Sequence, residues 1–253
     1  MKAIAAGRIV SWEGGSLWVL DVPPDAPSRN DEHAHHAFQL TFSLGGAFTL
    51  HLRDRVVSGP FAAVAPDAPH AFGARGLVAH LFVEPESPAG RALTHLIGEE
   101  PVAAIDRERV RDAPELIKRA FEHPTDATEK LREVGRLICG RIAGHARTVE
   151  PDRRVRQIIK WAASNLDGAP GIEQAAEAVG LSPSRASHLF VEETGLPFRT
   201  YVLWLRLTRA VDAHNSGLNL TDAAQAAGFA DSAHLSRTFK RMFGVPAAAL
   251  DIS

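Results

Sequence analysis

Histidines gather in a short stretch near the start of the chain and recur after a proline-containing segment. His33 and His35 are separated by one residue, and His70 follows Pro66 and Pro69. On a strand, His33 and His35 would point to the same face, because strand side chains alternate between the two faces. Imidazoles on one surface can coordinate zinc, nickel, copper or iron, or hydrogen-bond an organic molecule. The stretch therefore predicts a site for a small ligand.

A second chemically active group lies near the end of the chain, with helical spacing. Within Thr221 to Gly244, Gly228 ends a run of small residues, and a second helix begins near Asp231, a residue type that caps helices. The second helix has an apolar stripe of Leu235, Phe239, Met242 and Phe243, and a polar face of Ser232, His234, Ser236, Arg237, Lys240 and Arg241. This pattern is typical of a helix-turn-helix, whose second helix enters the DNA major groove.

An earlier stretch, Ile172 to Gly195, repeats this pattern. The matched pairs are Gly180 with Gly228, Ser184 with Ser232, Phe190 with Phe239, Gly195 with Gly244, and Pro197 with Pro246. The 17 residues between them, Phe198 to His214, have helical periodicity. Such a helix spans about 26 Å. With its connections it could hold two recognition helices about one DNA turn, roughly 34 Å, apart.

From about Arg153 to Leu250 the chain resembles the AraC family of bacterial transcription regulators. The double motif, the linker helix with Arg206 and Ala210, and the run GFADSAHLSRTFKRMFG carry the resemblance. It implies a DNA-binding domain. Val191 stands where lysine is common in the family, which removes one phosphate contact. The residues after Gly244 also depart from the family, with Pro246, Ala247, Leu250 and Asp251 where Ser or Thr, then Pro, an aromatic residue and Arg are usual.

The recognition helices each offer exposed polar positions for DNA contacts. Our candidates are Ser184, Arg185 and His188 in the first helix and Ser232, Ser236, Arg237, Lys240 and Arg241 in the second. Arg237 is the best candidate for base readout, because arginine bonds bidentately to guanine. We expect Lys240 and Arg241 to contact phosphates.

The histidine region is similar to the two motifs of the cupin fold. The run His33-x-His35-x3-Gln39-x6-Gly46 is similar to the first motif, and the run from Gly59 through Pro66 to His70 to the second. The resemblance implies that His33, His35, Gln39 and His70 take the metal-ligand positions. Gln39 stands where the family usually has glutamate. AraC-type regulators often carry a metal-free cupin-like barrel, so a transition metal, an organic effector and purely structural histidines stay open. We expect His36, His51 and His80 to be solvated or packed.

The periodicity predicts an α+β protein of several domains. Short runs with Gly and Pro punctuation over residues 1–86 predict a small cupin-like β-barrel. Residues 87–147 turn helical, and residues 153–253 form the all-α DNA-binding domain, after a hinge at Thr148 to Asp152. The longest helix, Asp126 to Ala146, has an apolar stripe of Leu131, Val134, Leu137, Ile138 and Ile142. The stripe predicts a homodimer through this helix, unless it only covers the barrel.

Composition sets outer limits. The 253 residues are 45% hydrophobic and 23% charged, as in globular proteins of one or two domains. The net charge of −2 requires a nucleic-acid binder to concentrate its basic residues on one face. Cys139 is the single cysteine, which excludes an internal disulfide and is expected in a core. No run has the length of a membrane span or signal peptide, so we expect a cytoplasmic protein without membrane partners.

Together these features predict a transcription regulator. An N-terminal barrel would sense a small molecule or metal, and the C-terminal part would bind promoter DNA, with RNA polymerase as a further candidate partner. We expect no enzymatic activity. The alternative is a cupin-type metalloenzyme with an accessory helical domain, which Gln39 and the C-terminal motifs argue against. A third class, a constitutive architectural DNA-binding protein without an effector, is disfavoured because it would not need the barrel.

Overall fold

The structure, a computed structural model, describes residues 4–26, 29–98, 100–103, 110–144 and 150–252. It forms two compact units, Met1–Thr148 with Phe239–Ser253, and Val149–Thr238. The first thus combines the N-terminal sheet with the last residues of the chain. The first two residues of the predicted hinge, 148 and 149, lie outside the described residues. No helix among the described residues is long and apolar enough to cross a membrane.

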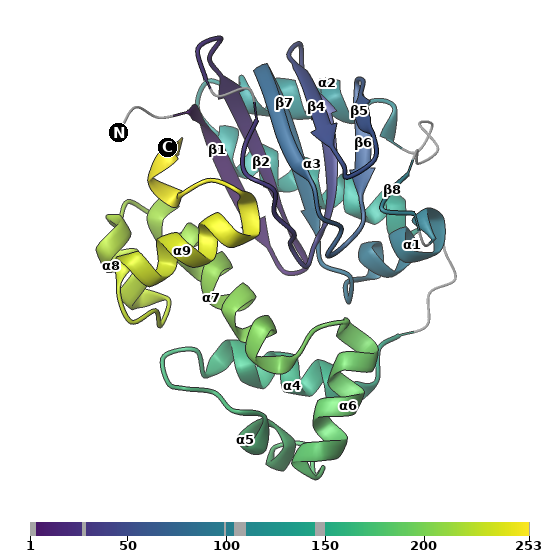
Figure 1. The fold of residues 1–253 in the computed structure, drawn as a ribbon, viewed down its shortest axis with the longest axis vertical. Coiled ribbons are helices and arrows are strands. Elements are labelled where there is room, and N and C mark those ends of the chain that lie inside the picture. The colour runs from purple at the N-terminus through teal and green to yellow at the C-terminus, as the bar shows by residue number, and fades with distance from the viewer. Residues whose placement is uncertain (1–3, 27–28, 99, 104–109, 145–149, 253) are drawn as a thin grey trace. The chain divides into compact units, whose positions relative to one another are not determined.

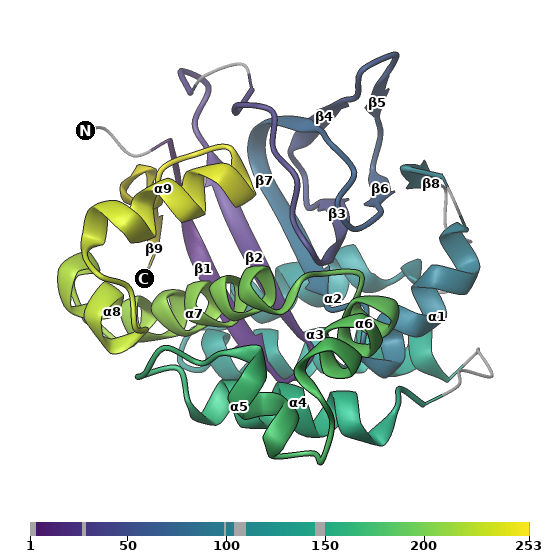
Figure 2. The ribbon, with the colours of Figure 1, turned by 60° about the horizontal axis from the view of Figure 1, so that its bottom comes forward.

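The first unit is built on a mixed sheet (Figure 1). Its strands are β1 (Ala5–Trp12), β2 (Gly15–Val22), β3 (Phe38–Ser43), β4 (Ala47–His51), β5 (Val56–Ser58), β6 (Phe61–Val64), β7 (Ala71–Val83), β8 (Val102–Ala103) and β9 (Leu250–Ile252). The order is β8-β6-β3-β7-β2-β1-β9, and β4 joins β5 to β7. β7 is shared between the two sets of strands (Figure 2). Pairing among the described residues does not close the sheet, so the predicted barrel is not confirmed.

The turn after β3 shows why β7 can bend. Gly46 lies directly on the backbone of Gly76, and a Cβ there would come within 2.7 Å of the Leu77 carbonyl oxygen. Gly76 itself has φ of +69°, a conformation that L side chains rarely adopt. The strand therefore runs on from its pairing with β4 into its pairing with β3. The sequence predicted only the later part of β7, Val78 to Val83.

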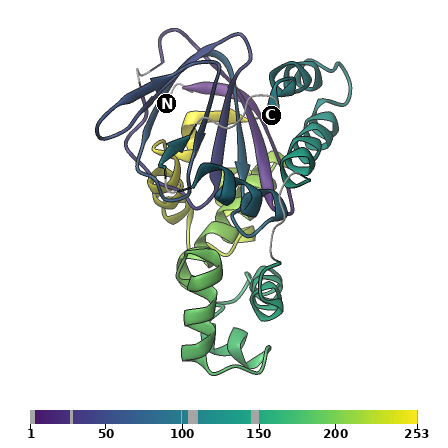
Figure 3. The same ribbon diagram turned by 90° about the vertical axis from the view of Figure 1, so that its right-hand side faces the viewer.

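Alternation along the central strands gives the sheet two different faces. One face packs on the helices α1 (Pro88–Ile97), α2 (Ala113–Phe121) and α3 (Ala127–Ala143), which Figure 3 shows beside the strands. This core contains Leu17 and Val19 of β2, Phe38, Leu40 and Phe42 of β3, and Ala79, Leu81 and Val83 of β7. The residues between them, among them Trp18, Gln39 and His80, point to the other face. That face carries the candidate ligand site.

The apolar stripe of α3 is mostly used inside its own unit. Leu131, Ile138 and Ile142 are buried in the core beneath the sheet, and Val134 is partly buried against it. Leu137 is 45% exposed. The alternative that this helix covers the sheet therefore accounts for most of the stripe. A homodimer through α3 stays a prediction.

The second unit contains the first helix-turn-helix and the linker helix. Its helices are α4 (Arg153–Ser164), α5 (Ile172–Glu177), α6 (Pro183–Thr194), α7 (Phe198–Asn215) and α8 (Leu220–Ala226), and α9 (Ser232–Phe243) begins in it. Arg206 of α7 donates to the carbonyl oxygens of Leu166 and Gly168 at 3.2 and 2.6 Å. The linker helix is thereby joined to the loop after α4.

The two turns share one backbone geometry. Gly180 and Gly228 both have left-handed φ, +68° and +79°. The next N–H then bonds back to an alanine, Leu181 to the Ala176 oxygen and Phe229 to the Ala224 oxygen, each at 2.9 Å. Glycine adopts this conformation without steric cost, which explains the matched glycines. The internal repeat predicted from the sequence is confirmed as a structural repeat.

Candidate functional site

Three histidines meet on the sheet face opposite the helices. His33 and His70 face each other as an antiparallel bridge, with backbone nitrogen-to-oxygen distances of 2.9 and 3.0 Å. The backbone of His35 accepts a bond from Asp67 N at 2.9 Å. One ligand atom from each of the three rings lies within 4.8 Å of the others. A tetrahedral metal holds nitrogen ligands about 3.4 Å apart, so the rings would close slightly on such an ion.

All three rings present the same nitrogen to the backbone. Nδ1 of His33, His35 and His70 lies 3.0, 2.9 and 2.8 Å from the carbonyl oxygens of Asp31, Ala37 and Ala68. A carbonyl only accepts, so each Nδ1 carries the proton and each neutral ring keeps its Nε2 lone pair. Nε2 of His70 is buried and has no hydrogen-bond partner among the described residues. This arrangement fixes three imidazoles as metal ligands are usually fixed.

Burial keeps these imidazoles neutral. Desolvation, with the charge of His70 as the second cause, lowers the pKa of His33 to about 4 and that of His35 well below 6.5. Desolvation also lowers the pKa of His70. Neutral imidazole is the form that binds metals.

Gln39 connects the histidines to a further buried ring. Its Nε2 donates to Thr41 Oγ1 at 3.0 Å, and Thr41 Oγ1 lies 3.0 Å from Nδ1 of His80. This orientation turns Oε1 of Gln39 to Nε2 of His35, 3.0 Å away. Two acceptors at this distance are satisfied only when a proton or a metal ion lies between them. Rotation of the amide would instead let Gln39 donate to His35, because amide orientation is assigned from the hydrogen-bond network.

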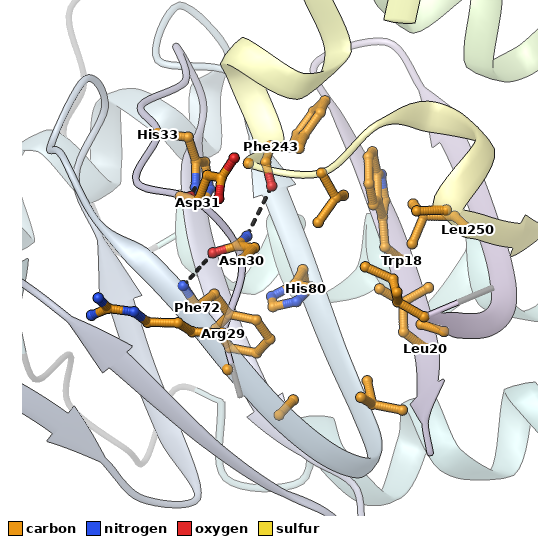
Figure 4. Close-up of a pocket in the computed structure, with 18 of the residues that line it drawn as sticks. Trp18, Leu20, Arg29, Asn30, Asp31, His33, Phe72, His80, Phe243 and Leu250 are labelled. Atoms are coloured by element: carbon orange, nitrogen blue, oxygen red, sulfur yellow. Dashed lines mark hydrogen bonds between the residues drawn. The ribbon is translucent and has the colours of Figure 1, made fainter. Parts of the chain in front are cut away.

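A cavity of about 340 Å³ opens beside this cluster (Figure 4). The wall includes His33 of the cluster and Gln39, whose amide oxygen lies 3.0 Å from Nε2 of His35. Most of the remaining wall is apolar, with Trp18, Leu20, Phe72, Phe82, Phe243 and Leu250. His80 also lines the cavity, and desolvation lowers its pKa to about 3. The site offers a largely apolar volume with neutral nitrogen groups at one side, and the charged residues Arg29, Asp31 and Lys240 also line it.

The end of α9 forms part of this wall. Asn30 donates through Nδ2 to the Phe243 oxygen at 2.9 Å and accepts at Oδ1 from Phe72 N at 2.6 Å. The N–H of Asp31 donates to the Gly244 oxygen at 3.1 Å, and the Asp31 carboxylate lies 3.0 Å from Nζ of Lys240. The loop that carries His33 thereby holds the last residues of the second recognition helix.

Most of the candidate DNA-contacting side chains are exposed, but two serines are half-buried and Lys240 is held in an ion pair. Ser184, Arg185 and His188 of α6 are exposed, and Nδ1 of His188 bonds the Ser184 oxygen at 2.7 Å. In α9, Arg237, Lys240 and Arg241 are exposed, whereas Ser232 and Ser236 are half-buried. The expected cap at Asp231 is confirmed, because its Oδ1 accepts from His234 N at 2.6 Å. The pairing of Lys240 with Asp31 competes with a phosphate contact.

Sequence reasoning missed several residues of the cavity. Among the histidines expected outside the site, His80 lines the cavity, and His36 is buried 3.0 Å from Glu86. Strand alternation could have placed His80 beside Phe82 and opposite Thr41. No sequence pattern indicates that Asn30 holds Phe243, because the two are 213 residues apart.

The C-terminal part of the chain is similar in sequence to known proteins. Residues 175–251 match the family model described as a helix-turn-helix domain. Over 89 residues the chain is 30% identical to the uncharacterized HTH-type transcriptional regulator YpdC of Escherichia coli, covering 35% of this chain and 31% of YpdC. It is 33% identical over 94 residues to the HTH-type transcriptional activator RhaS of Escherichia fergusonii, covering 37% and 34%. The matches thus span about a third of these relatives.

The fold is similar to that of ToxT from Vibrio cholerae over nearly the whole chain. A crystal structure of that protein superposes with a TM-score of 0.58 at 10% identity, covering 94% of this chain and 96% of ToxT. ToxT with bound unsaturated fatty acid gives 0.55 at 11% identity, covering 93% and 94%. Such low identity supports the fold alone.

The structure thus combines a sheet unit with a C-terminal part that contains paired helix-turn-helix motifs. Residues 175–251 carry a helix-turn-helix domain of the AraC type, and this part of the chain is similar to transcription regulators.

Proposed function

We propose that this chain regulates transcription by binding specific promoter DNA under the control of an effector in the N-terminal unit. The exposed side chains of α6 and α9 supply the base and phosphate contacts, with Arg237 as the main base reader. The metal-ligating or effector-binding set is His33, His35, Gln39 and His70. We propose that these four residues are arranged as in the cupin fold.

A divalent transition-metal ion is the effector that the chemistry of the site favours. The observation that carries this proposal is the common orientation of three buried imidazoles, each with Nδ1 on a carbonyl oxygen. The unpartnered Nε2 of His70 supports it, since a buried polar atom without a partner is costly. Neutral nitrogen ligands suit zinc, nickel, copper or iron(II). Gln39 Oε1 would be a fourth ligand.

A signal from the cluster has a short route to the second recognition helix. His33 follows Asn30 and Asp31 in the loop that bonds Phe243 and Gly244. An ion that draws the His33 ring toward His35 and His70 would shift this loop. The ion changes DNA affinity only if it binds more tightly to one arrangement of the α9 end than to the other.

DNA binding by the full chain, with and without metal, tests the proposal. Binding sites are first selected from a random DNA pool, and affinity is then measured by fluorescence anisotropy in chelator-treated and Zn²⁺-loaded protein. We expect Zn²⁺ to change the affinity, and replacement of His33 and His35 by Ala together to remove that change. Equal affinity in all four samples would reject metal control, and absence of any selected site would reject sequence-specific binding.

An organic effector is the second candidate, favoured by the apolar cavity beside the histidines. The ToxT structure with bound unsaturated fatty acid supports an apolar acid as its class. Under this alternative, DNA affinity would respond to the acid equally before and after chelation. A cupin-type metalloenzyme would instead turn a substrate over, and the AraC-type domain argues against it.

We keep the homodimer and contact with RNA polymerase as parts of the proposal. Leu137 is the apolar residue of α3 that remains available for a partner copy, at 45% exposure. Sedimentation of the full chain at micromolar concentration, with Leu137→Glu as the variant, tests the dimer. A monomeric parent protein would reject it.

A further inference from the structure

The candidate metal ligands carry no negative charge. The cluster groups three histidines, and no carboxylate of the described residues joins them. An imidazole is neutral when it coordinates a metal, and the fourth ligand, Gln39, is a neutral amide. A divalent ion held here would keep its full charge of two. This consequence rests on the metal site proposed above.

An uncompensated charge is costly at this place. His33, His35, Gln39 and His70 are all buried, with exposed fractions of 7%, 2%, 3% and 0%. Buried charges in proteins are paired, because loss of water is not otherwise offset. Of the nearby carboxylates, Asp31 lines the cavity but pairs with Lys240, and Glu86 pairs with His36. We therefore expect the compensating anion to come from outside the chain.

The cavity determines what kind of anion fits. It adjoins the cluster at His33 and Gln39, so a ligand in the cavity lies beside two of the four candidate metal ligands. Trp18, Leu20 and Phe82 line it further along, and its volume of about 340 Å³ is in the range of small-molecule sites. Hydroxide or chloride would leave this apolar volume unfilled. A carboxylate with an apolar body satisfies both requirements.

We propose that the metal-loaded cluster is a receptor for a small organic carboxylate, bound with its carboxylate toward the metal and its apolar body in the cavity. Metal and carboxylate bind together. The anion is necessary because Gln39 is neutral and stands in place of a charged ligand. The regulator then responds to the carboxylate only when metal is present. This separates the proposal from an organic effector that binds on its own.

Cobalt(II) and benzoate provide a direct test on the full chain. Cobalt(II) accepts the same ligands as zinc and reports its coordination by visible absorption. We expect benzoate to change this spectrum saturably, and benzyl alcohol, a neutral molecule of similar shape, to bind at least about tenfold more weakly. Calorimetry should detect no benzoate binding to chelator-treated protein. Equal binding with and without metal, or equal binding of the alcohol, would overturn the proposal.

Two substitutions separate the charge from the cavity. Gln39→Glu should keep cobalt and weaken benzoate by at least about tenfold, because the new carboxylate compensates the ion. Leu20→Trp should keep cobalt and lose benzoate by filling the cavity, and Ala74→Leu is the milder variant if the first fails to fold. Unchanged benzoate affinity in Gln39→Glu would reject the charge argument. Failure of the parent protein to bind cobalt would instead reject the metal site itself.

Discussion

Gly244, the first residue after α9, lies against His33. A Cβ at Gly244 would come within 2.8 Å of Nδ1 of His33, and its φ of +71° is left-handed. The Gly244 oxygen accepts from Asp31 N at 3.1 Å. The end of the second recognition helix and the first histidine of the candidate metal site are thus in direct contact.

The internal repeat provides a matched control for this contact. Gly195 holds the equivalent place after α6, with φ of +77° and nothing within 4 Å of its Cβ position. Both Gly→Ala changes should cost about 1 kcal/mol of backbone strain. Only Gly244→Ala should also weaken Zn²⁺ binding, measured by calorimetric titration, because the methyl group displaces the His33 loop. Equal Zn²⁺ affinity in the two variants would contradict the coupling.

Packing of α3 on the sheet predicts opposite effects for two glycines in one helix. A Cβ at Gly135 would overlap the indole of Trp12, whereas Gly140 has open space around it. Gly135→Ala should destabilise the protein by about 1–3 kcal/mol through overpacking. Gly140→Ala should stabilise it by up to about 1 kcal/mol, because alanine favours helix. Urea unfolding of both variants measures the difference, and stabilisation by both would show that α3 does not lie on Trp12.

The sequence predicted the repeated motif well and the sheet only in part. Local signals are strong where glycine must take a left-handed φ, and Gly180 and Gly228 therefore located both turns. The curvature of the sheet depends on Gly46 meeting Gly76, a contact between distant segments. Periodicity also could not tell whether the α3 stripe covers its own sheet or a partner, since both bury the same residues.

For the histidines too, the sequence predicted local spacing but not contacts between distant segments. Spacing predicted that His33 and His35 share a face, and His70 joins them. The cavity remained hidden, because its walls come from β2, β7 and the residues after α9. His80, which pairs with Thr41 across the sheet, is one of the residues that line it.

DNA recognition should depend on individual side chains of α9. Arg237→Ala should cost about 1–3 kcal/mol at the selected site and relax preference at one base pair. Arg241→Ala should lower the slope of log affinity against log salt by roughly 1, with less effect on sequence preference. Arg119→Ala, which removes an exposed charge from α2, is the control. If Arg237→Ala binds as tightly as this control, α9 does not read bases as proposed.

Lys240 should behave differently from Arg241. Its Nζ pairs with the Asp31 carboxylate at 3.0 Å, so a phosphate contact requires that pair to break. Asp31→Asn should therefore tighten DNA binding, by an amount typical of an exposed ion pair, up to about 1 kcal/mol. Anisotropy titrations of Asp31→Asn and of the double variant with Lys240→Ala measure this. A tightening that persists without Lys240 would show that the pair is not its cause.

Cys139 should be unreactive in the folded protein. Burial raises the pKa of its thiol to about 12, which leaves little thiolate at pH 8. An ordinary thiol would carry roughly a thousandfold more thiolate at this pH. Ellman's reagent should therefore react slowly with native protein and rapidly after unfolding in guanidinium. Fast reaction of the native protein would place Cys139 outside the core.

Metal stoichiometry tests the central claim most directly. Chelator-treated protein is titrated with Zn²⁺ by calorimetry, and the bound metal is then counted by elemental analysis. The account predicts one ion per chain in the parent and in a His51→Ala control, and none in the variant with His33 and His35 both replaced by Ala. Binding of no ion by the parent, or of one ion by the double variant, would contradict a metal site at His33, His35 and His70.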